Sequence, residues 1–391
     1  MLRIVFLMVV AMSQLAQAEQ IRVATFNVSM DATNYVEDVN SITGDELFER
    51  LATGEHQQIK NIAEIIQHVR PDIILLNEFD YTDDDTKGVL AFTKNYLAKS
   101  QHGKQPIDYP YYYTAPVNTG VGSGHDLNKD GVASGTKDDA FGFGFYPGQY
   151  GMVLLSRFPI DKAQVRTFQL FKWQDMPNNT LTTIADENGQ PWYSAQAQQD
   201  LRLSSKSHWD VPINVNGQTL HVLASHPTPP VFDGPENRNG KRNHDEVRFW
   251  VDYISGGQQA GYIYDDKGHT GGFSGQRFVV MGDLNSSMSE GDSHKQAIVD
   301  LLTHTKVNAD IIPKSKGGKA HTPNNHLAAT HTAGWRMRAD YALPAKAGLT
   351  VQHAEVFWPT KDDALYRLIK DRSSSSDHRL VWLDLVLENS K

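Results

Sequence analysis

Short apolar runs are the feature of this sequence that most limits its possible folds. Seven of them, each of four to eight residues, have the length and composition of buried β-strands and end at polar or glycine-rich sequence. They are residues 21–28, 73–76, 152–155, 220–224, 278–281, 339–343 and 380–387. The sequence therefore predicts buried β-strands that recur from residue 21 to residue 387.

Helices are expected between these strands. Ile59, Ile62, Ile66 and Val69 recur at helical spacing in EHQQIKNIAEIIQHVRP, and Pro71 ends the pattern. A second helix is predicted in NHDEVRFWVDYI, whose first residue and the acid three places later resemble a capping arrangement.

Three long loops separate the elements, at residues 111–148, 227–242 and 303–334. They contain aromatic residues and glycines and few runs of charge, which favours ordered loops over disordered linkers. Long ordered loops in a compact chain usually carry function, so we expect functional residues there.

The N-terminus has the three-part layout of a secretory signal. Arg3 precedes an apolar core at residues 4–12, and AQA occupies residues 16–18. The apolar core is far shorter than the roughly 20 residues of a membrane-spanning helix, so we expect no stable membrane insertion. The sequence predicts a signal peptide at residues 1–18, cleaved after Ala18, and an exported chain of residues 19–391 that forms one domain.

Composition excludes several kinds of chemistry. The chain has no cysteine, which rules out disulfides, thiolate zinc sites and a cysteine nucleophile. Lys and Arg number 37 against 46 Asp and Glu, a net charge of −9 that becomes −10 when Arg3 leaves with the signal. A protein that binds nucleic acid mainly by neutralising phosphates would carry a basic tail or stripe, and none occurs here. Any contact with nucleic acid is therefore expected to be local.

Side chains capable of catalysis follow several of the predicted strands. They are Asn27, Asn77, Glu78, His226, Asp283, Asn285, Asp340, Asp377 and His378. Each alone is typical of the turn that ends a strand. Together they offer the oxygen ligands that Mg²⁺ requires and histidines that exchange protons near neutral pH. Converging carboxylates would repel one another without a cation, so the set indicates a divalent metal.

Six of these segments, ATFNV, LLNEFD, ASHPTP, VVMGDLNSS, RADYAL and SSDHRLVW, occur in that order between residues 21 and 387. With them the chain resembles the endonuclease/exonuclease/phosphatase superfamily, which includes deoxyribonuclease-I-like nucleases, abasic-site endonucleases, sphingomyelinases and inositol-phosphate phosphatases. The resemblance implies an α/β (α+β) fold, a four-layer α/β/β/α sandwich of two packed mixed β-sheets with outer helices. It also implies an active site at one rim.

The resemblance assigns a role to each residue that matches a motif. Asn27 and Glu78 would hold the catalytic ion, Mg²⁺ or Mn²⁺, with Glu78 as a direct ligand. Asp283 would orient or deprotonate the attacking water. Asn285 would hold a phosphate oxygen, and His226 would donate a hydrogen bond to a phosphoryl oxygen.

Three further residues receive roles from the last two motifs. His378 would bond the phosphoryl group or act as acid and base, and Asp340 would fix the tautomer of its ring. Asp377 would hold the metal or a second ion, and the number of ions stays open. The second motif departs from the family, because Asn77 stands where many members have glutamine.

The loop after the motif ASHPTP carries a basic group, formed by Arg238, Arg242 and His244. Their position close to His226 in the sequence makes them candidates for binding a phosphate other than the scissile one. The alternative is an exposed basic loop that leads into the predicted helix.

A separate metal signal lies in the first long loop. Asp126, Asn128 and Asp130 fit the opening of a calcium loop, D-x-N-x-D-G. The twelfth position, which holds glutamate in such loops, is Lys137. A structural Ca²⁺ is predicted here, with a Gly/Asp-rich turn as the alternative.

The sequence as a whole predicts an exported, Mg²⁺- or Mn²⁺-dependent phosphoesterase that hydrolyses phosphate mono- or diesters by activated water. A nuclease and a phosphatase of small esters both remain open, so the partner is a phosphate ester and nucleic acid is one candidate. A sphingomyelinase-like phospholipase is an alternative, as is a non-catalytic exported binding protein on the same fold. The oligomeric state is not predicted.

Overall fold

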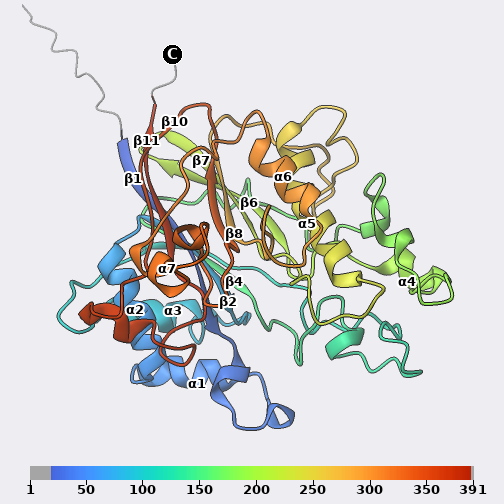
Figure 1. Ribbon diagram of the computed structural model, residues 1–391, viewed down its shortest axis with the longest axis horizontal. Coiled ribbons are helices and arrows are strands. Elements are labelled where there is room, and N and C mark those ends of the chain that lie inside the picture. The colour runs from blue at the N-terminus through green and yellow to red at the C-terminus, as the bar shows by residue number, and fades with distance from the viewer. Residues whose placement is uncertain (1–18, 389–391) are drawn as a thin grey trace, which may run out of the picture.

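The computed structural model describes residues 19–388, so the predicted signal peptide lies outside the described residues. Two β-sheets pack face to face, and helices lie on their outer sides (Figure 1). This arrangement confirms the predicted sandwich of two mixed sheets with outer helices. Within the described residues, no helix combines the length and apolar character needed to cross a membrane.

The first sheet has six strands in the order β10-β11-β1-β2-β4-β3. Its strands are β1 (Glu19–Met30), β2 (Ile73–Phe79), β3 (Tyr111–Tyr113), β4 (Met152–Ser156), β10 (Leu349–Val356) and β11 (Val381–Leu387). The central strand β1 pairs in parallel with β2 and antiparallel with β11. The sheet is therefore mixed, and its two innermost strands end at the same edge.

The second sheet has five strands in the order β5-β6-β7-β8-β9. Its strands are β5 (Arg166–Thr167), β6 (His208–Val215), β7 (Gln218–Ser225), β8 (Phe278–Asp283) and β9 (Asp340–Pro344). Strands β7 and β8 run in parallel, and the other neighbours are antiparallel. As in the first sheet, a parallel pair sits at the centre.

Alternation along β1 explains how the layers bury one another. Phe26 faces outward into a core shared with Ile62 of α2, whereas Val23 faces inward into a core shared with Val280 of β8. The long helices are α1 (Glu46–Thr53), α2 (Gln57–Val69), α5 (Arg238–Ser255) and α6 (Lys295–Thr303). In Figure 1, α1 and α2 lie on the side of the first sheet, and α5 and α6 lie on the side of the second.

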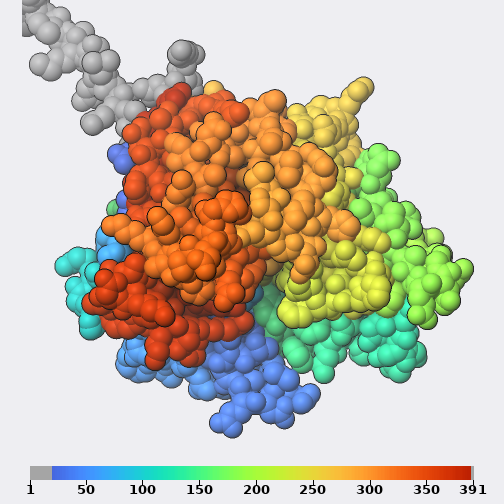
Figure 2. All heavy atoms as spheres, in the orientation of Figure 1, coloured from blue at the N-terminus to red at the C-terminus, as the bar shows by residue number. Residues whose placement is uncertain are grey.

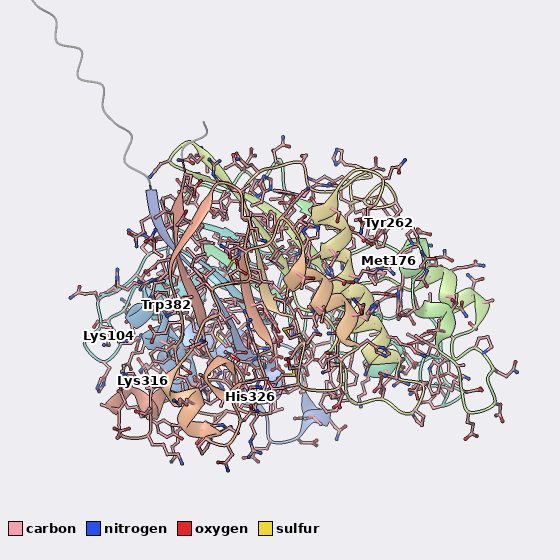
Figure 3. All side chains as sticks on the ribbon, turned by 45° about the horizontal axis from the view of Figure 1, so that its top comes forward. Lys104, Met176, Tyr262, Lys316, His326 and Trp382 are labelled. Carbon is pink, nitrogen blue, oxygen red and sulfur yellow. The ribbon has the colours of Figure 1, made fainter. Side chains whose placement is uncertain are left out.

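Three short helices lie in the connections. They are α3 (Val89–Phe92), α4 (Ala195–Asp200) and α7 (Lys316–His321). The last third of the chain covers much of one face, shown in orange and red beside the yellow surface of α5 (Figure 2). Figure 3 marks the two sides of the molecule, with Lys104 and Trp382 on one and Met176 and Tyr262 on the other.

The two predicted helices have different outcomes. The pattern that ends before Pro71 is confirmed as α2. The second helix exists, but the predicted cap at Asn243 is wrong because α5 begins earlier, at Arg238. Asn243 is fully buried, and its Nδ2 donates to the backbone oxygens of Thr228 at 2.8 Å and Leu284 at 3.0 Å. The side-chain amide of Asn243 therefore makes tertiary hydrogen bonds and does not cap the helix.

Candidate active site

Strand register brings the predicted site residues together at one rim of the sandwich. In the first sheet, Asn27 of β1 is the register partner of Asn77 of β2. In the second sheet, Asp283 at the end of β8 is the register partner of Asp340 at the start of β9. The two sheets meet where Asn27 Nδ2 donates to Asp283 Oδ2 at 3.1 Å. The polar strand ends therefore form one cluster.

Gly282 lets the ends of β7 and β8 approach each other closely. It has φ +146°, and a Cβ at this position would lie 2.0 Å from the backbone oxygen of Ser225. Only glycine avoids that clash. Because β7 and β8 are parallel, the approach brings His226, which follows β7, next to Asp283.

Two histidines flank one carboxylate oxygen of Asp283. His226 Nε2 lies 3.5 Å and His378 Nε2 lies 3.7 Å from Asp283 Oδ2, and all three side chains are buried. The other oxygen, Oδ1, accepts a hydrogen bond from the backbone N–H of Asn285 at 3.0 Å. Asn285 itself donates from Nδ2 to the backbone oxygen of Pro227 at 3.2 Å. Asp283 is thus fixed with one oxygen directed at both histidines.

Asp340 holds the other side of the His378 ring, as the family resemblance implied. His378 Nδ1 lies 2.9 Å from Asp340 Oδ2, which also accepts a hydrogen bond from Thr332 Oγ1 at 2.7 Å. The Trp335 ring meets the imidazole edge-on at 5.6 Å between ring centres. Thr332 and Trp335 were not among the predicted site residues, because a single threonine or tryptophan in a long loop carries no local signal.

The two histidines carry different charges because their surroundings differ. Burial lowers the pKa of His378, but the attraction of Asp340 and Asp283 outweighs it and raises that pKa to about 10. Burial and the nearby Lys206 ammonium lower the pKa of His226 to about 4. At neutral pH His378 is therefore cationic and His226 is neutral.

The carboxylates respond to the same surroundings. Burial raises the pKa of Asp283, but His378, His226 and Asn27 together bring it well below its usual range. Asp340 has its pKa raised to about 6 by burial, with His378 acting against the increase and Asp283 adding to it. Both acids are therefore ionised at neutral pH, and the pair with His378 is an ion pair.

Glu78 lies at the rim in an environment that disfavours its charge. It has φ +56°, a left-handed conformation that is uncommon for glutamate. Burial and the neighbouring Asp31 raise the pKa of its carboxyl group to about 7. Arg372 is the nearest cation, with Nη2 3.9 Å from Glu78 Oε2. A divalent cation would relieve this unfavourable charge, so the hard oxygen donors present here fit one.

A different group of residues also lies close enough together to bind a metal ion. Ligand atoms of Asp283, Asp340 and His378 lie within 4.8 Å of one another, and among residues 19–388 no other trio of acids and histidines does so. However, His378 Nδ1 is already hydrogen-bonded to Asp340. We therefore interpret this trio as a hydrogen-bonded unit, and metal binding by Glu78 stays a prediction.

Asp377 shares Arg372 with Glu78 and has protein partners. Its Oδ2 lies 3.3 Å from Arg372 Nη1, and its Oδ1 accepts from Ser29 Oγ at 3.3 Å. Arg372 therefore contacts both predicted metal-binding acids. A direct metal-binding role for Asp377 stays a prediction.

The structure places two of the three predicted phosphate-binding residues at a pocket. Arg238 and Arg242 line a pocket of about 520 Å³ that also contains Glu78 and His226, whereas His244 does not line it. Arg238 pairs with Glu236 Oε1 at 3.2 Å. Arg242 donates to the backbone oxygens of residues 202 and 203, each at 2.9 Å. Both guanidinium groups thus already have protein partners.

The predicted calcium loop is closed by its own hydrogen bonds. Asp126 accepts from the backbone N–H groups of Asp130 at 3.2 Å and Gly131 at 2.9 Å, and Asn128 Nδ2 donates to Asp130 Oδ2 at 3.0 Å. Within the described part of the chain, no trio of acids or histidines converges here. The Ca²⁺ site stays a prediction.

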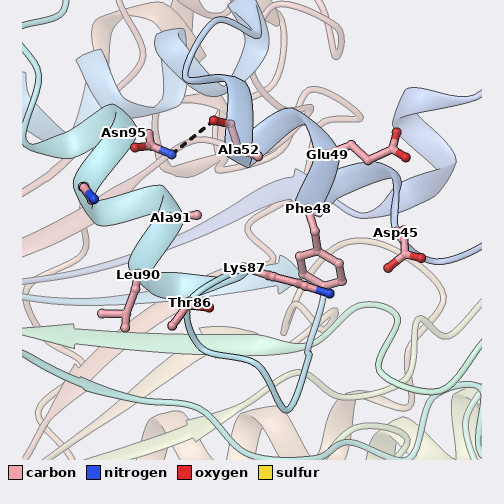
Figure 4. Close-up of a pocket in the computed structure, with 10 residues that line it drawn as sticks. Asp45, Phe48, Glu49, Ala52, Thr86, Lys87, Leu90, Ala91 and Asn95 are labelled. Carbon is pink, nitrogen blue, oxygen red and sulfur yellow. Dashed lines mark hydrogen bonds between the residues drawn. The ribbon is translucent and has the colours of Figure 1, made fainter.

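A second pocket, of about 680 Å³, lies between α1 and α3 (Figure 4). Its lining consists of Asp45, Phe48, Glu49, Ala52, Thr86, Lys87, Leu90, Ala91, Lys94 and Asn95. None of these is a predicted site residue, whereas Glu78 and His226 line the smaller pocket.

Comparisons with known proteins bear on the family and the fold. The profile of the Endonuclease/Exonuclease/phosphatase family matches residues 24–378. An endonuclease/exonuclease/phosphatase from Beutenbergia cavernae is 16% identical, with 95% of this chain and 72% of that one covered and a TM-score of 0.52. A family protein from Leptotrichia buccalis is 14% identical, with 93% and 98% covered and a TM-score of 0.46. The similarity to the Beutenbergia cavernae structure supports the fold. No curated protein sequence matches the chain.

Proposed function

Because the chain belongs to the endonuclease/exonuclease/phosphatase family, we propose that it is a divalent-metal-dependent phosphoesterase that uses an activated water. Members of this family are hydrolases of phosphoester bonds. The observation that most strongly supports the proposal is the placement of Asp283 Oδ2 between His226 Nε2 at 3.5 Å and His378 Nε2 at 3.7 Å. An ionised carboxylate flanked by one neutral and one cationic imidazole suits water attack on a phosphoryl group.

Each side chain has a task that follows from its charge. Asp283 stays ionised and can orient a water at Oδ2 and accept its proton. His226 is neutral, so one ring nitrogen can donate a hydrogen bond to a phosphoryl oxygen. His378 is cationic and can stabilise charge on the phosphoryl or leaving oxygen, while Asp340 keeps its ring in place.

Glu78 and Asn27 would hold the metal, Mg²⁺ or Mn²⁺, with Asp377 as a further candidate ligand. When bound, a divalent cation neutralises negative charge on the phosphoryl oxygens. Asn27 Nδ2 also donates to Asp283 Oδ2. Asn27 therefore links the metal-binding side of the rim to the residue that orients water.

The test uses purified protein with phosphate mono- and diesters, in Mg²⁺ or in chelator. Asp283→Asn and His378→Gln are each expected to lower kcat by about 10² or more, as loss of one preorganised stabiliser does. Asp384→Asn is a matched control, because Asp384 pairs with Arg22 outside the site. Activity that survives Asp283→Asn or chelation would rule out the mechanism.

The substrate panel separates the remaining candidates. Plasmid DNA and RNA test a nuclease, small phosphate esters test a phosphatase, and sphingomyelin tests the phospholipase alternative. No hydrolysis of any substrate would favour a non-catalytic binding protein.

Export and calcium binding complete the proposal. The layout of residues 1–18 supports a secreted or periplasmic protein cleaved after Ala18. N-terminal sequencing of the exported protein tests this, and a first residue other than Glu19 would contradict it. The motif at Asp126, Asn128 and Asp130 supports a structural Ca²⁺ in addition to the catalytic ion.

A further inference from the structure

The pocket beside the catalytic residues has the size of a small-molecule site. Its volume of about 520 Å³ lies within the usual range for ligand pockets, roughly 300–1,000 Å³. It contains Glu78 and His226 and therefore opens onto the proposed reaction centre. Its apolar and aromatic lining includes Leu127, Phe143, Trp173, Tyr193, Leu201 and Phe232.

One part of the lining consists of polar groups that lack partners. Ser205 Oγ, Thr228 Oγ1 and His226 Nδ1 are buried, and no residue among 19–388 forms a hydrogen bond with them. His226 Nε2 has only the 3.5 Å approach to Asp283 Oδ2. All three residues line the pocket. A buried polar group without a partner costs about 1–3 kcal/mol, so a ligand is the natural partner for this cluster.

Lys206 adds a positive charge to the cluster. It is 5% exposed and lines the same pocket. Within the described chain, its ammonium makes no ion pair within 4.0 Å, and Glu246, Glu78 and Asp283 attract it from longer range. Buried ammonium groups are normally paired, because burial of an isolated charge is costly. An unpaired lysine in a pocket therefore indicates an anionic ligand.

Glu246 holds the cluster in position through backbone contacts and is the acid that most strongly attracts the Lys206 ammonium. From α5 its Oε1 accepts the backbone N–H of Ser205 and its Oε2 accepts that of Thr228, both at 2.6 Å. Both carboxylate oxygens thus bind backbone groups. The two hydroxyl-bearing residues are clamped beside Lys206, and their side chains stay available.

The number of donors favours one type of phosphate ester. A diester has two non-bridging oxygens and one negative charge, whereas a monoester has three such oxygens and up to two charges. His226, His378 and the metal provide for two oxygens in the proposed mechanism. Resting on that proposed function, we propose that Ser205, Lys206 and Thr228 bind the additional oxygen of a small phosphate monoester. The apolar wall then receives the alcohol part of the ester.

The first test compares two esters with the same leaving group. Lys206→Met is expected to lower kcat/KM for 4-nitrophenyl phosphate by about tenfold or more, because a charge-assisted hydrogen bond is lost. For bis(4-nitrophenyl) phosphate we expect a fall of less than about threefold, since that ester lacks the third oxygen. Lys319→Met, on the exposed surface of α7, is the control and should change neither value. An equal fall on both esters, or none on either, would overturn the inference.

The second test needs no catalysis. Inorganic phosphate is expected to raise the Tm of the wild type and of Lys319→Met, and to raise that of Lys206→Met much less. The Ser205→Ala/Thr228→Val double variant should resemble Lys206→Met, and it replaces that variant if Lys206→Met does not fold. Equal shifts in all variants would overturn the inference. If the wild type hydrolyses neither ester but phosphate still discriminates, the proposed function fails and the anion site stands.

Discussion

The backbone N–H of Asp283 donates a hydrogen bond to Asn77 Oδ1 at 3.2 Å, which joins the end of β8 to β2 in the opposite sheet. Asn77 Nδ2 also donates to the backbone oxygen of Ser225 at 3.4 Å. Asn77 is fully buried at this interface. The residue that departs from the family pattern is therefore a link between the two sheets directly beneath the proposed water-binding acid.

Asn77→Ala tests that link. It leaves the buried N–H of Asp283 without its partner, so the free energy of unfolding should fall by about 1–3 kcal/mol. Urea denaturation measures the change. The exposed Asn40→Ala is the control and should stay within about 0.5 kcal/mol of the wild type. A loss no larger than that of the control would show that Asn77 does not join the sheets.

Asp340→Asn tests the charge on His378. Without the Asp340 carboxylate, the pKa of His378 should fall from about 10 towards its ordinary value, and kcat should fall by about 10². NMR titration of the imidazole measures the first effect and steady-state kinetics the second. Asp384→Asn removes an acid of β11 outside the site and should change neither the pKa of His378 nor kcat. An unchanged His378 pKa would contradict the ion pair.

Glu78→Gln tests metal binding through stability. Mg²⁺ should raise the Tm of the wild type and not that of the variant, because ligand binding to the folded state alone is stabilising. Without metal the variant should be at least as stable as the wild type, since burial and Asp31 disfavour the Glu78 carboxylate. The exposed Glu187→Gln serves as the control and should retain the Mg²⁺ response. Retention of that response by Glu78→Gln would exclude it as a ligand.

His208 should make stability depend on pH. Burial lowers its pKa to about 4, whereas an unfolded histidine titrates near 6.5. The unfolded chain binds the proton first, so this contribution to stability is lost as pH falls from 6.5 to 4, at up to about 1.4 kcal/mol per pH unit. His208→Gln should flatten the slope in that window, and the exposed His326→Gln should not. Urea unfolding at several pH values measures both, and parallel slopes would contradict the assignment.

The calcium loop is tested by calorimetry. Titration of Ca²⁺ into the wild type should release or absorb heat that disappears in an Asp126→Ala/Asp130→Ala variant, because both carboxylates would bind the ion. Asp362→Ala, an exposed acid elsewhere, should keep the signal. An unchanged Ca²⁺ response in the double variant would leave the loop as a Gly/Asp-rich turn.

Local sequence was sufficient to predict much of the fold. The apolar runs that became β1, β2, β7, β8 and β11 were readable because burial on both faces of a strand selects apolar residues along a short continuous stretch. The helix before Pro71 was readable because its apolar spacing and its terminator are both local. The polar residues that follow these strands were correctly predicted to lie close together, with the family resemblance providing their order.

Other features depend on contacts between distant parts of the chain. Asn243 has the local appearance of a helix cap, yet it bonds to Thr228 and Leu284, which no nearby residue signals. Ser205 and Lys206 belong to no motif, and they form a cluster with Thr228 of the ASHPTP motif only because Glu246 binds the backbone groups of Ser205 and Thr228.

The sequence by itself determined seven of the eleven strands of the described chain, which residue types follow them and which family the motifs resemble. Strands β3, β5, β6 and β10 were not among those predicted. Only the tertiary structure decided the charges of His226 and His378, the role of Asn77 and the unpaired state of Lys206. The physical reason is that apolar periodicity acts over a few neighbouring residues. Desolvation, ion pairing and hydrogen-bond satisfaction instead depend on distances of a few ångströms between side chains that lie far apart in the chain.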